Sequence, residues 1–251
     1  MSEFGVGILS GGQHLRMGDD FHGRPKALLP LTPNEYGLLA YMMAACKRNG
    51  VPLWVVTEKW KLAQLRAYTP AGEGHTHWVE DPGRGTGVAL RRLLYAATAQ
   101  RLIVMNCDTV VPFDIFAISK LPTFEGPIRQ HLTLHSTQNE QLIGVSEERD
   151  KAFVTHWGEA DGIAPSGSPI KASSSGIYEV NVALMRQLLT GEESLELDVM
   201  PHLVHRGDVT AVVHPSSYPT FDYGTPGRYR ELIRDSTAIT NYLRSMGLLR
   251  A

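Results

Sequence analysis

The sequence has few of the features that mark secreted, membrane-spanning or nucleic-acid-binding proteins. Its only two cysteines, Cys46 and Cys107, match no paired spacing, so we expect no disulfide framework and a reducing, cytoplasmic setting. The longest apolar run, Leu38 to Cys46, is about half of the roughly 20 residues that a membrane-spanning helix needs. With 24 Lys and Arg against 26 Asp and Glu, the formal charge is −2. Nucleic acid and membrane are therefore not expected partners.

Two common nucleotide-binding motifs are also missing. Neither the Walker pattern G-x-x-x-x-G-K-[ST] nor G-x-G-x-x-G occurs, which argues against a P-loop ATPase and a dinucleotide-binding fold. The ten histidines show no recognisable zinc-ligand spacing, so no zinc site is predicted. Apolar residues make up 43% of the 251 residues, which is enough for a sizeable core.

The first half of the chain alternates buried strands with amphipathic helices. Strands are predicted at Phe4 to Leu9, Leu53 to Thr57, His77 to Glu80 and Leu102 to Met105, and helices from Thr32 to about Gly50, at Lys59 to Tyr68 and at Thr86 to Ala99. The first helix would be capped by a T-x-x-E box at Thr32 and Glu35. Strands that alternate with helices imply crossover connections and a mainly parallel sheet covered on both faces.

The second half, from about residue 121, changes character. Short, closely spaced segments at His131 to His135, Gln141 to Val145 and Ala152 to Trp157 favour antiparallel strands, and residues 164 to 175 are predicted as an exposed loop. Further elements are predicted at Gly176 to Val180, Val182 to Leu189, Leu195 to His205, Val209 to Val213 and from Pro226 onward. No linker separates the halves, so we expect one domain, 1–251, of the α/β class with a mostly parallel central sheet and a small antiparallel portion.

A glycine pair follows the first predicted strand. Gly11 and Gly12 would let backbone N–H groups approach a phosphate chain closely, and Arg16 and Lys26 could add positive charge to the same anion. The same pair could also form a plain tight turn without a ligand.

Two aspartates occupy positions typical of ligand-binding side chains in parallel sheets. Asp108 follows an apolar strand, and Asp222 lies just before the last predicted helix. Together they could offer two carboxylates to Mg²⁺, a cation usually held by one or two protein carboxylates plus phosphate oxygens. Each aspartate taken alone could instead form a turn or cap a helix.

These segments, in order, resemble the motifs of the nucleoside-diphosphate-sugar pyrophosphorylases, also called sugar-1-phosphate nucleotidyltransferases. The matching stretches are Gly11-Gly12 with Arg16 and Pro25-Lys26, Glu80 to Gly87, Asp108, Ser175 to Tyr178, Ser194 to Glu196, and Asp222 to Pro226. The resemblance spans nearly the whole chain. It implies a Rossmann-like nucleotidyltransferase fold, with about 1–120 binding the nucleotide and about 121–251 the acceptor. The implied reaction transfers a nucleoside monophosphate from an NTP to a sugar 1-phosphate and releases pyrophosphate.

The resemblance also implies roles for individual residues. The triphosphate would be held by Ser10, Gly11, Gly12, Gln13, His14 and Arg16, the reacting phosphates by Lys26, the base by Gly85, Thr86 and Gly87, the sugar by Gly176 and Glu196, and Mg²⁺ by Asp108 and Asp222. Arg16, Lys26 and Asp108 would form the catalytic group. Glu196 could instead be a carboxylate that meets the dipole of the helix capped by Ser194.

Departures from the family pattern leave the acceptor open. The family's E-K-P segment, whose lysine contacts the sugar phosphate, is missing from Trp157 to Asp161, so Lys171 or Lys151 would have to supply that cation. A cytidylyltransferase acting on a non-sugar phosphate or phosphonate therefore remains an alternative, as does an inactive nucleotide-binding regulator of the same fold. A glycosyltransferase would hold its metal with D-x-D, where this chain has Asn106-Cys107-Asp108.

The base preference depends on Glu80. An ionised carboxylate only accepts hydrogen bonds, and guanine presents two adjacent donors, cytosine one amine, and uracil or thymine a single N–H between two carbonyl oxygens. GTP is therefore the first expectation and CTP the second. Glu80 could instead be a solvated charge at a strand end. A homo-oligomer is compatible with the sequence.

Overall fold

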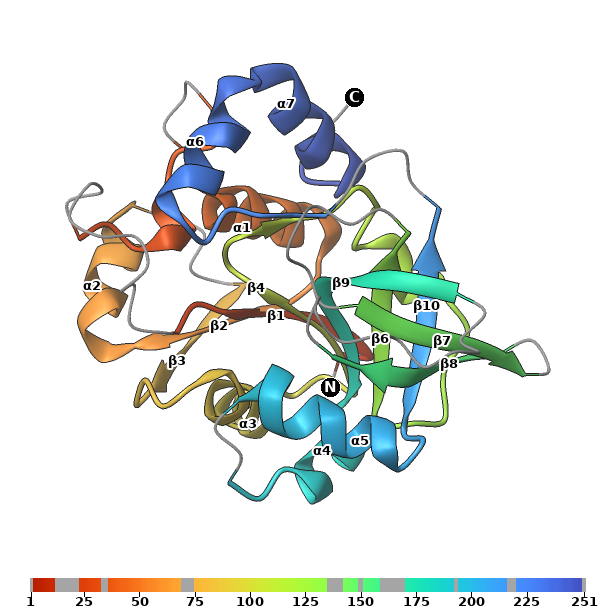
Figure 1. Cartoon of the computed structure of the whole chain (residues 1–251). Helices are drawn as coiled ribbons and strands as arrows, with labels where there is room; N and C mark the ends of the chain where they lie inside the picture. Colours follow the sequence, from red (N-terminus) through yellow and green to blue (C-terminus); the bar gives the residue numbers. More distant parts are fainter. Residues whose placement is uncertain are drawn as a thin grey trace.

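A mixed sheet crosses the molecule in the strand order β3-β2-β1-β4-β9-β6-β10-β8-β7 (Figure 1). The computed structural model describes residues 2–11, 23–32, 36–68, 75–134, 142–148, 151–158, 170–191, 194–215 and 220–249. Within these ranges no helix is long and apolar enough to cross a membrane.

The first four strands are parallel neighbours, as the alternating pattern predicted. They are β1 (Phe4–Leu9), β2 (Leu53–Glu58), β3 (Thr76–Asp81) and β4 (Arg101–Asn106). β1 pairs with β2 and β4, and its register places Leu9 opposite Asn106. The carboxyl ends of these strands therefore meet at one edge of the sheet, where open parallel sheets bind their ligands.

The remaining strands form the antiparallel portion. They are β6 (Ile128–Thr133), β7 (Leu142–Glu148), β8 (Lys151–Trp157), β9 (Ile170–Asn181) and β10 (Val209–His214). β9 runs antiparallel to β4 and β6, and β10 is parallel to β6 but antiparallel to β8. The predicted α/β class, with a Rossmann-like sheet and an added antiparallel portion, is confirmed.

The predicted exposed loop at 164–175 is wrong over residues 170–175, because β9 begins at Ile170. Ser173 pairs with Thr133 of β6 and with Leu142 of β7, and it is buried. Ser175 is also buried, and its Oγ donates a hydrogen bond of 2.6 Å to the backbone carbonyl of His131. Small hydroxyl side chains with internal partners can line a buried strand without a desolvation penalty. Residues 164–169 lie outside the described ranges.

Helices cover both faces of the sheet (Figure 1). One face carries α1 (Leu38–Asn49), α2 (Lys59–Tyr68), α6 (Pro226–Arg234) and α7 (Ser236–Ser245), and the other carries α3 (Thr86–Ala96), α4 (Val182–Leu188) and α5 (Met200–His205). Leu53 and Val55 of β2 enter the first core, while Trp54 and Val56 enter the second. This period of two is what a strand between two helical layers requires.

The predicted capping box at Thr32 is wrong. α1 begins at Leu38 and has Gly37 at its N-cap with no side-chain cap, while the Thr32 hydroxyl hydrogen-bonds the Tyr41 hydroxyl at 2.7 Å. A Cβ at Gly37 would collide with the backbone of Ala27 and Leu28, so close packing fixes where the helix begins. Residues 33–35 lie outside the described ranges.

Other helix bounds differ from the predictions at their ends. α3 stops at Ala96 instead of Ala99, because Ala97 has an extended backbone. The helix predicted from Leu195 opens as a π-helical turn, η4 (Leu195–Val199), and continues as α5. The last predicted helix is two helices, α6 and α7, separated by Asp235.

Candidate active site

A two-stranded ribbon brings the two predicted metal carboxylates together. β5 (Thr109–Val110) follows Asp108 directly, and β11 (Phe221–Asp222) pairs with it so that Asp222 lies opposite Thr109. The backbone N–H of Tyr223 donates to the carbonyl of Asp108 at 2.9 Å, and its hydroxyl donates to the carbonyl of Cys107 at 3.1 Å. The segment that begins with Asp222 and Tyr223 is thus held against the residues that follow β4.

Gly224 lies at the centre of the charged side chains. A Cβ built at this position would be 2.8 Å from Asp108 Oδ2, 2.8 Å from Asp222 Oδ1 and 3.0 Å from Lys26 Nζ. The Gly224 backbone N–H also donates to Asp222 Oδ1 at 2.6 Å. Lys26, Asp108 and Asp222, which we call the carboxylate cluster, can approach one another because residue 224 has no side chain.

Each carboxylate of the cluster has a cationic partner. Lys26, on the short helix η2 (Lys26–Leu28), places its Nζ 2.9 Å from Asp108 Oδ2, and both side chains are largely buried. Arg228, in the first turn of α6, places its Nη1 3.2 Å from Asp222 Oδ2. Charge is therefore locally balanced, with one basic side chain beside each carboxylate.

The environment of Asp222 favours the approach of a further positive charge. Burial raises the pKa of this carboxyl, and the Asp108 carboxylate raises it further, while the Gly224 N–H, Arg228 and Lys26 act in the opposite direction. Two carboxylates that share a partly dehydrated space are stabilised by a divalent cation. In the described ranges no group of three or more His, Cys, Asp or Glu could hold a metal. The pair Asp108 and Asp222 nevertheless fits Mg²⁺, which takes one or two protein carboxylates and completes its shell with phosphate oxygens and water.

A small polar cavity opens beside the carboxylate cluster. Its volume is about 180 Å³. It is lined by Asn106, Thr109, Ser174, Ser175, Gly176, Tyr178, Glu196, Thr220, Asp222 and Arg228. The structure thus brings together Gly176, Glu196 and Asp222, which the sequence placed in separate motifs. Most of the lining side chains carry a hydroxyl, amide or carboxylate group that can bind a hydroxylated ligand.

The predicted base-binding and sugar-binding segments are in direct contact. Thr86, at the start of α3, donates a hydrogen bond of 2.7 Å from its Oγ1 to Glu196 Oε2 and accepts one of 2.9 Å from the Leu195 N–H. The indole N–H of Trp157 donates to the Glu196 carbonyl at 2.8 Å. Glu196 is therefore held by its side chain and its backbone at the mouth of the cavity.

The end of β3 presents two acidic side chains in different environments. Glu80 is exposed, whereas Asp81 is only 5% exposed and lies against Gly11, where a built Cβ would be 2.9 Å from Asp81 Oδ2. Burial raises the pKa of Asp81, and the Glu58 carboxylate adds to that rise. Glu58 itself is paired with the fully buried Lys61. The sequence analysis did not identify the buried charged groups Asp81, Glu58 and Lys61. Strand alternation was the available signal, because it places Asp81 and its neighbour Glu80 on opposite faces of β3.

Several predicted residues are placed by the structure without a test of their role. Ser10 is fully buried and donates its backbone N–H to the Val56 carbonyl at 2.8 Å. Gly85 is the N-cap of α3, and Gly87 lies buried in its first turn. The predicted residues Gly12, Gln13, His14 and Arg16, and the side chain of Lys171, lie outside the described part of the chain.

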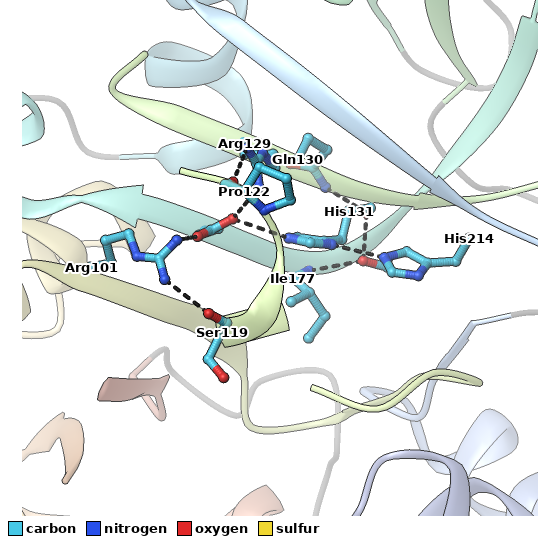
Figure 2. Close-up of polar contacts among 10 residues, drawn as sticks. Arg101, Ser119, Pro122, Arg129, Gln130, His131, Ile177 and His214 are labelled. Atoms are coloured by element: carbon cyan, nitrogen blue, oxygen red, sulfur yellow. Dashed lines mark hydrogen bonds and ion pairs between the residues drawn. The ribbon is translucent and has the colours of Figure 1, made fainter. Parts of the chain in front are cut away.

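A buried polar network connects β4, β9, β6 and β10 (Figure 2). Glu179 accepts hydrogen bonds of 2.9 Å from Arg101 and 3.0 Å from Arg129. His131 Nδ1 lies 2.8 Å from His214 Nε2. Burial lowers the pKa of His131 well below its usual value and that of His214 to about 4, so both rings are neutral at pH 7. The network thus joins β9, the strand that contains Gly176 of the cavity lining, to its neighbours β4 and β6.

Comparison with known proteins agrees with this geometry. Residues 6–117 match the MobA-like NTP transferase domain. Among solved structures, the chain is similar to HddC from Yersinia pseudotuberculosis, with 19% identity, a TM-score of 0.65, and coverage of 91% of this chain and 97% of that one. It is also similar to a protein from Bacillus anthracis described as a glucose-1-phosphate thymidylyltransferase and crystallised with a sucrose, with 16% identity, a TM-score of 0.72, and coverage of 94% and 95%. No curated protein sequence matches the chain.

The class that the comparisons indicate is a nucleotidyltransferase: residues 6–117 match a domain of that class, and the similarity to the solved structures extends the shared fold over the rest of the chain. More particularly, residues 6–117 are similar to the MobA-like NTP transferase domain, and the chain as a whole shares the fold of the two solved structures, as the motifs predicted. Lys26 and Asp108 lie within the matched residues, whereas Glu196 and Asp222 lie beyond them.

Proposed function

We propose that this protein transfers a nucleoside monophosphate from an NTP to a sugar 1-phosphate, forming an NDP-sugar and pyrophosphate. One observation carries the proposal: Lys26, Asp108 and Asp222 converge around Gly224, directly beside a small polar cavity. This convergence lies at the end of β4, within and next to an NTP transferase domain. Under this proposal, a site for a triphosphate and a site for a hydroxylated acceptor would adjoin.

The reaction requires positioning and charge stabilisation more than proton transfer. A phosphomonoester, with a second pKa near 6, is largely dianionic at pH 7, so its oxygen can attack without a general base. A bond forms between that oxygen and the α-phosphorus, the bond from the α-phosphorus to the bridging oxygen breaks, and pyrophosphate leaves with its electron pair. Groups that stabilise charge on the phosphates in this transition state supply most of the catalysis.

The residues of the cluster are suited to this task. Lys26 would exchange its contact with Asp108 for the phosphates and stabilise the charge that develops on them. Arg16 would act on the same triphosphate. Asp108 and Asp222 would hold Mg²⁺, which supplies Lewis-acid stabilisation of phosphate oxygens when it is bound.

The cavity supports a small hydroxylated acceptor. Its volume of about 180 Å³ is below the range of roughly 300–1,000 Å³ typical of pockets for drug-sized ligands. Glu196 and Gly176 line it and would contact the sugar, with Glu196 accepting hydrogen bonds from hydroxyl groups. A structural neighbour described as a glucose-1-phosphate thymidylyltransferase supports the sugar 1-phosphate class.

The base preference remains the prediction made from Glu80: GTP first and CTP second. Its exposed side chain on β3 is accessible to a base that contacts Gly85, Thr86 and Gly87. The cytoplasmic setting is likewise proposed, since Cys46 and Cys107 are free thiols buried in the structure.

A pyrophosphate-release screen tests the proposed function. Each of the four NTPs would be combined with a panel of sugar 1-phosphates and small non-sugar phosphates, with Mg²⁺ present, and the products identified by mass spectrometry. We expect pyrophosphate and an NDP-sugar in equal amounts from at least one sugar 1-phosphate. Turnover restricted to non-sugar phosphates would favour the cytidylyltransferase alternative, and no turnover with any pair would contradict the proposal.

A further inference from the structure

The acceptor side of the site needs a cation that no motif supplied. A phosphomonoester brings nearly two negative charges at pH 7 into a cavity that already contains Asp222 and Glu196. The two lysines considered from the sequence do not resolve this. Lys151 pairs with Glu125 at 3.1 Å on an exposed surface and lines a separate cavity with Phe124 and Phe153. The side chain of Lys171 lies outside the described residues.

Building on the proposed function, we infer that Arg228 binds the phosphate group of the acceptor. Among the described residues that line the polar cavity, Arg228 is the one basic side chain. Its guanidinium lies next to Asp222. Under the proposed function Asp222 is part of the reaction centre, so the acceptor phosphate would meet the α-phosphate close to Arg228.

The guanidinium has donors available for this task. It donates one hydrogen bond, from Nη1 to Asp222 Oδ2 at 3.2 Å, and its other N–H groups make no hydrogen bond to any residue that the structure describes. Arginine carries five N–H donors in a planar fork that matches two phosphate oxygens at once. Arg228 can therefore bind a phosphate in bidentate fashion, which a lysine at the same place could not.

The contact with Asp222 is one that Arg228 can give up. The side chains of Arg228 and Asp222 are 34% and 47% exposed, so water screens the attraction between them. A divalent cation on Asp222 would offset the charge of that carboxylate and weaken its attraction for the guanidinium further. The donors of Arg228 would then be available to a phosphate in the cavity that this side chain lines.

The backbone that carries Arg228 is firmly placed. Arg228 donates its backbone N–H to the Thr225 hydroxyl at 3.4 Å, which caps α6. The next residue, Tyr229, donates from its hydroxyl to the Pro30 carbonyl at 2.6 Å, just beyond η2 and Lys26. The cation for the acceptor and the cation for the nucleotide are thus on elements that are tied to each other.

Arg228→Gln tests the inference, with Arg234→Gln as the matched control, because Arg234 is exposed at the far end of the same helix. At saturating NTP we expect Arg228→Gln to raise the KM for the sugar 1-phosphate by about tenfold or more, the loss typical of a charge-assisted phosphate contact. The KM for the NTP should stay within about twofold, since the nucleotide phosphates are held by other groups. Arg228→Lys should recover only part of the loss. Arg234→Gln should match the wild type.

An unchanged KM for the acceptor in Arg228→Gln would overturn the inference while leaving the proposed function in place. An equal rise in both KM values would also overturn it, because Arg228 would then act on the cluster as a whole. If no sugar 1-phosphate is turned over, the proposed function fails, and inorganic phosphate tests Arg228 separately. Calorimetry in a Lys26→Ala background should detect phosphate binding that the added Arg228→Gln abolishes. Absent or unaltered binding would refute the assignment.

Discussion

Gly224→Ala is the substitution that most sharply separates catalysis from folding in this protein. A methyl group at residue 224 would lie 2.8 Å from Asp108 Oδ2 and Asp222 Oδ1 and 3.0 Å from Lys26 Nζ. To reach ordinary contact at 3.4 Å, the three charged groups would have to retreat by about 0.4 to 0.6 Å each. All three are ends of side chains, so they can move without displacing the backbone.

The expected cost to stability is therefore small. Overpacking usually costs about 1–3 kcal/mol, and retreat of side-chain ends puts this case near 1 kcal/mol. For a chain of this size that corresponds to a fall in Tm of about 2–4 °C. Activity should fall much more, because a displacement near 1 Å in an active site can cost about a hundredfold. We expect kcat to drop between about tenfold and a hundredfold.

Pyrophosphate release and thermal melts of the same samples would measure the two effects. Gly227→Ala is the control: it lies three residues further on, in α6, and a Cβ there meets no atom of the residues that the structure describes within 4 Å. It should retain wild-type activity and stability, or gain slightly in stability from lower chain entropy in the unfolded state. A Gly224→Ala protein with wild-type kcat would refute the reasoning that the cluster is the reaction centre.

The other predictions concern charges in and around the cluster. Lys26→Ala and Arg16→Ala should fold normally, as judged by circular dichroism, and lose at least about a hundredfold in kcat. Activity should require Mg²⁺ or Mn²⁺, and Asp108→Asn and Asp222→Asn should raise the metal concentration needed for half-maximal rate; full activity in EDTA would contradict this. Burial raises the pKa of Asp222 in the folded state, so the free energy of unfolding falls as pH rises from the pKa of the unfolded chain through that of the folded protein. Asp222→Asn lacks this ionisation and should melt at or above the wild-type Tm at pH 7. In a competition of the four NTPs, Glu80→Gln should weaken the preference for GTP, and a wild-type preference for UTP or dTTP would remove Glu80 from the base site.

The alternation of apolar runs and amphipathic stretches was sufficient to predict the parallel half of the sheet. β1 has the predicted bounds, and so does α2, because local periodicity determines both. Prediction failed where tertiary packing overrides a local signal. The capping motif at Thr32 is a valid pattern, yet the contact of Gly37 with the Ala27 backbone sets the start of α1.

The prediction of a loop for the serine-rich segment before Gly176 was wrong for a related reason. Its composition is typical of a loop, but Ser173 and Ser175 are buried in β9, and Ser175 finds an internal hydrogen-bond partner. A single sequence carries no sign of such partners, because they come from β6, about 40 residues earlier in the chain.

The candidate site likewise contains residues that the sequence could identify and one that it could not. Lys26, Asp108 and Asp222 could be named from ordered motifs, and the structure brings them together through the β5–β11 ribbon. Arg228 had no motif to mark it, since its position in the cavity follows from the first turn of α6 lying beside that ribbon. The sequence alone could not predict which side chains would lie together in the cavity.

The central claim is that an oxygen of the acceptor phosphate attacks the α-phosphorus of the NTP. It can be tested directly with a turnover-competent sugar 1-phosphate in which all three non-ester phosphate oxygens are ¹⁸O, followed by ³¹P NMR and mass spectrometry of the products. The account predicts that all of the label remains in the NDP-sugar, with one labelled oxygen bridging the two phosphorus atoms, and that the released pyrophosphate is unlabelled. Formation of an NDP together with a sugar bisphosphate, or of free phosphate without an NDP-sugar, would contradict it.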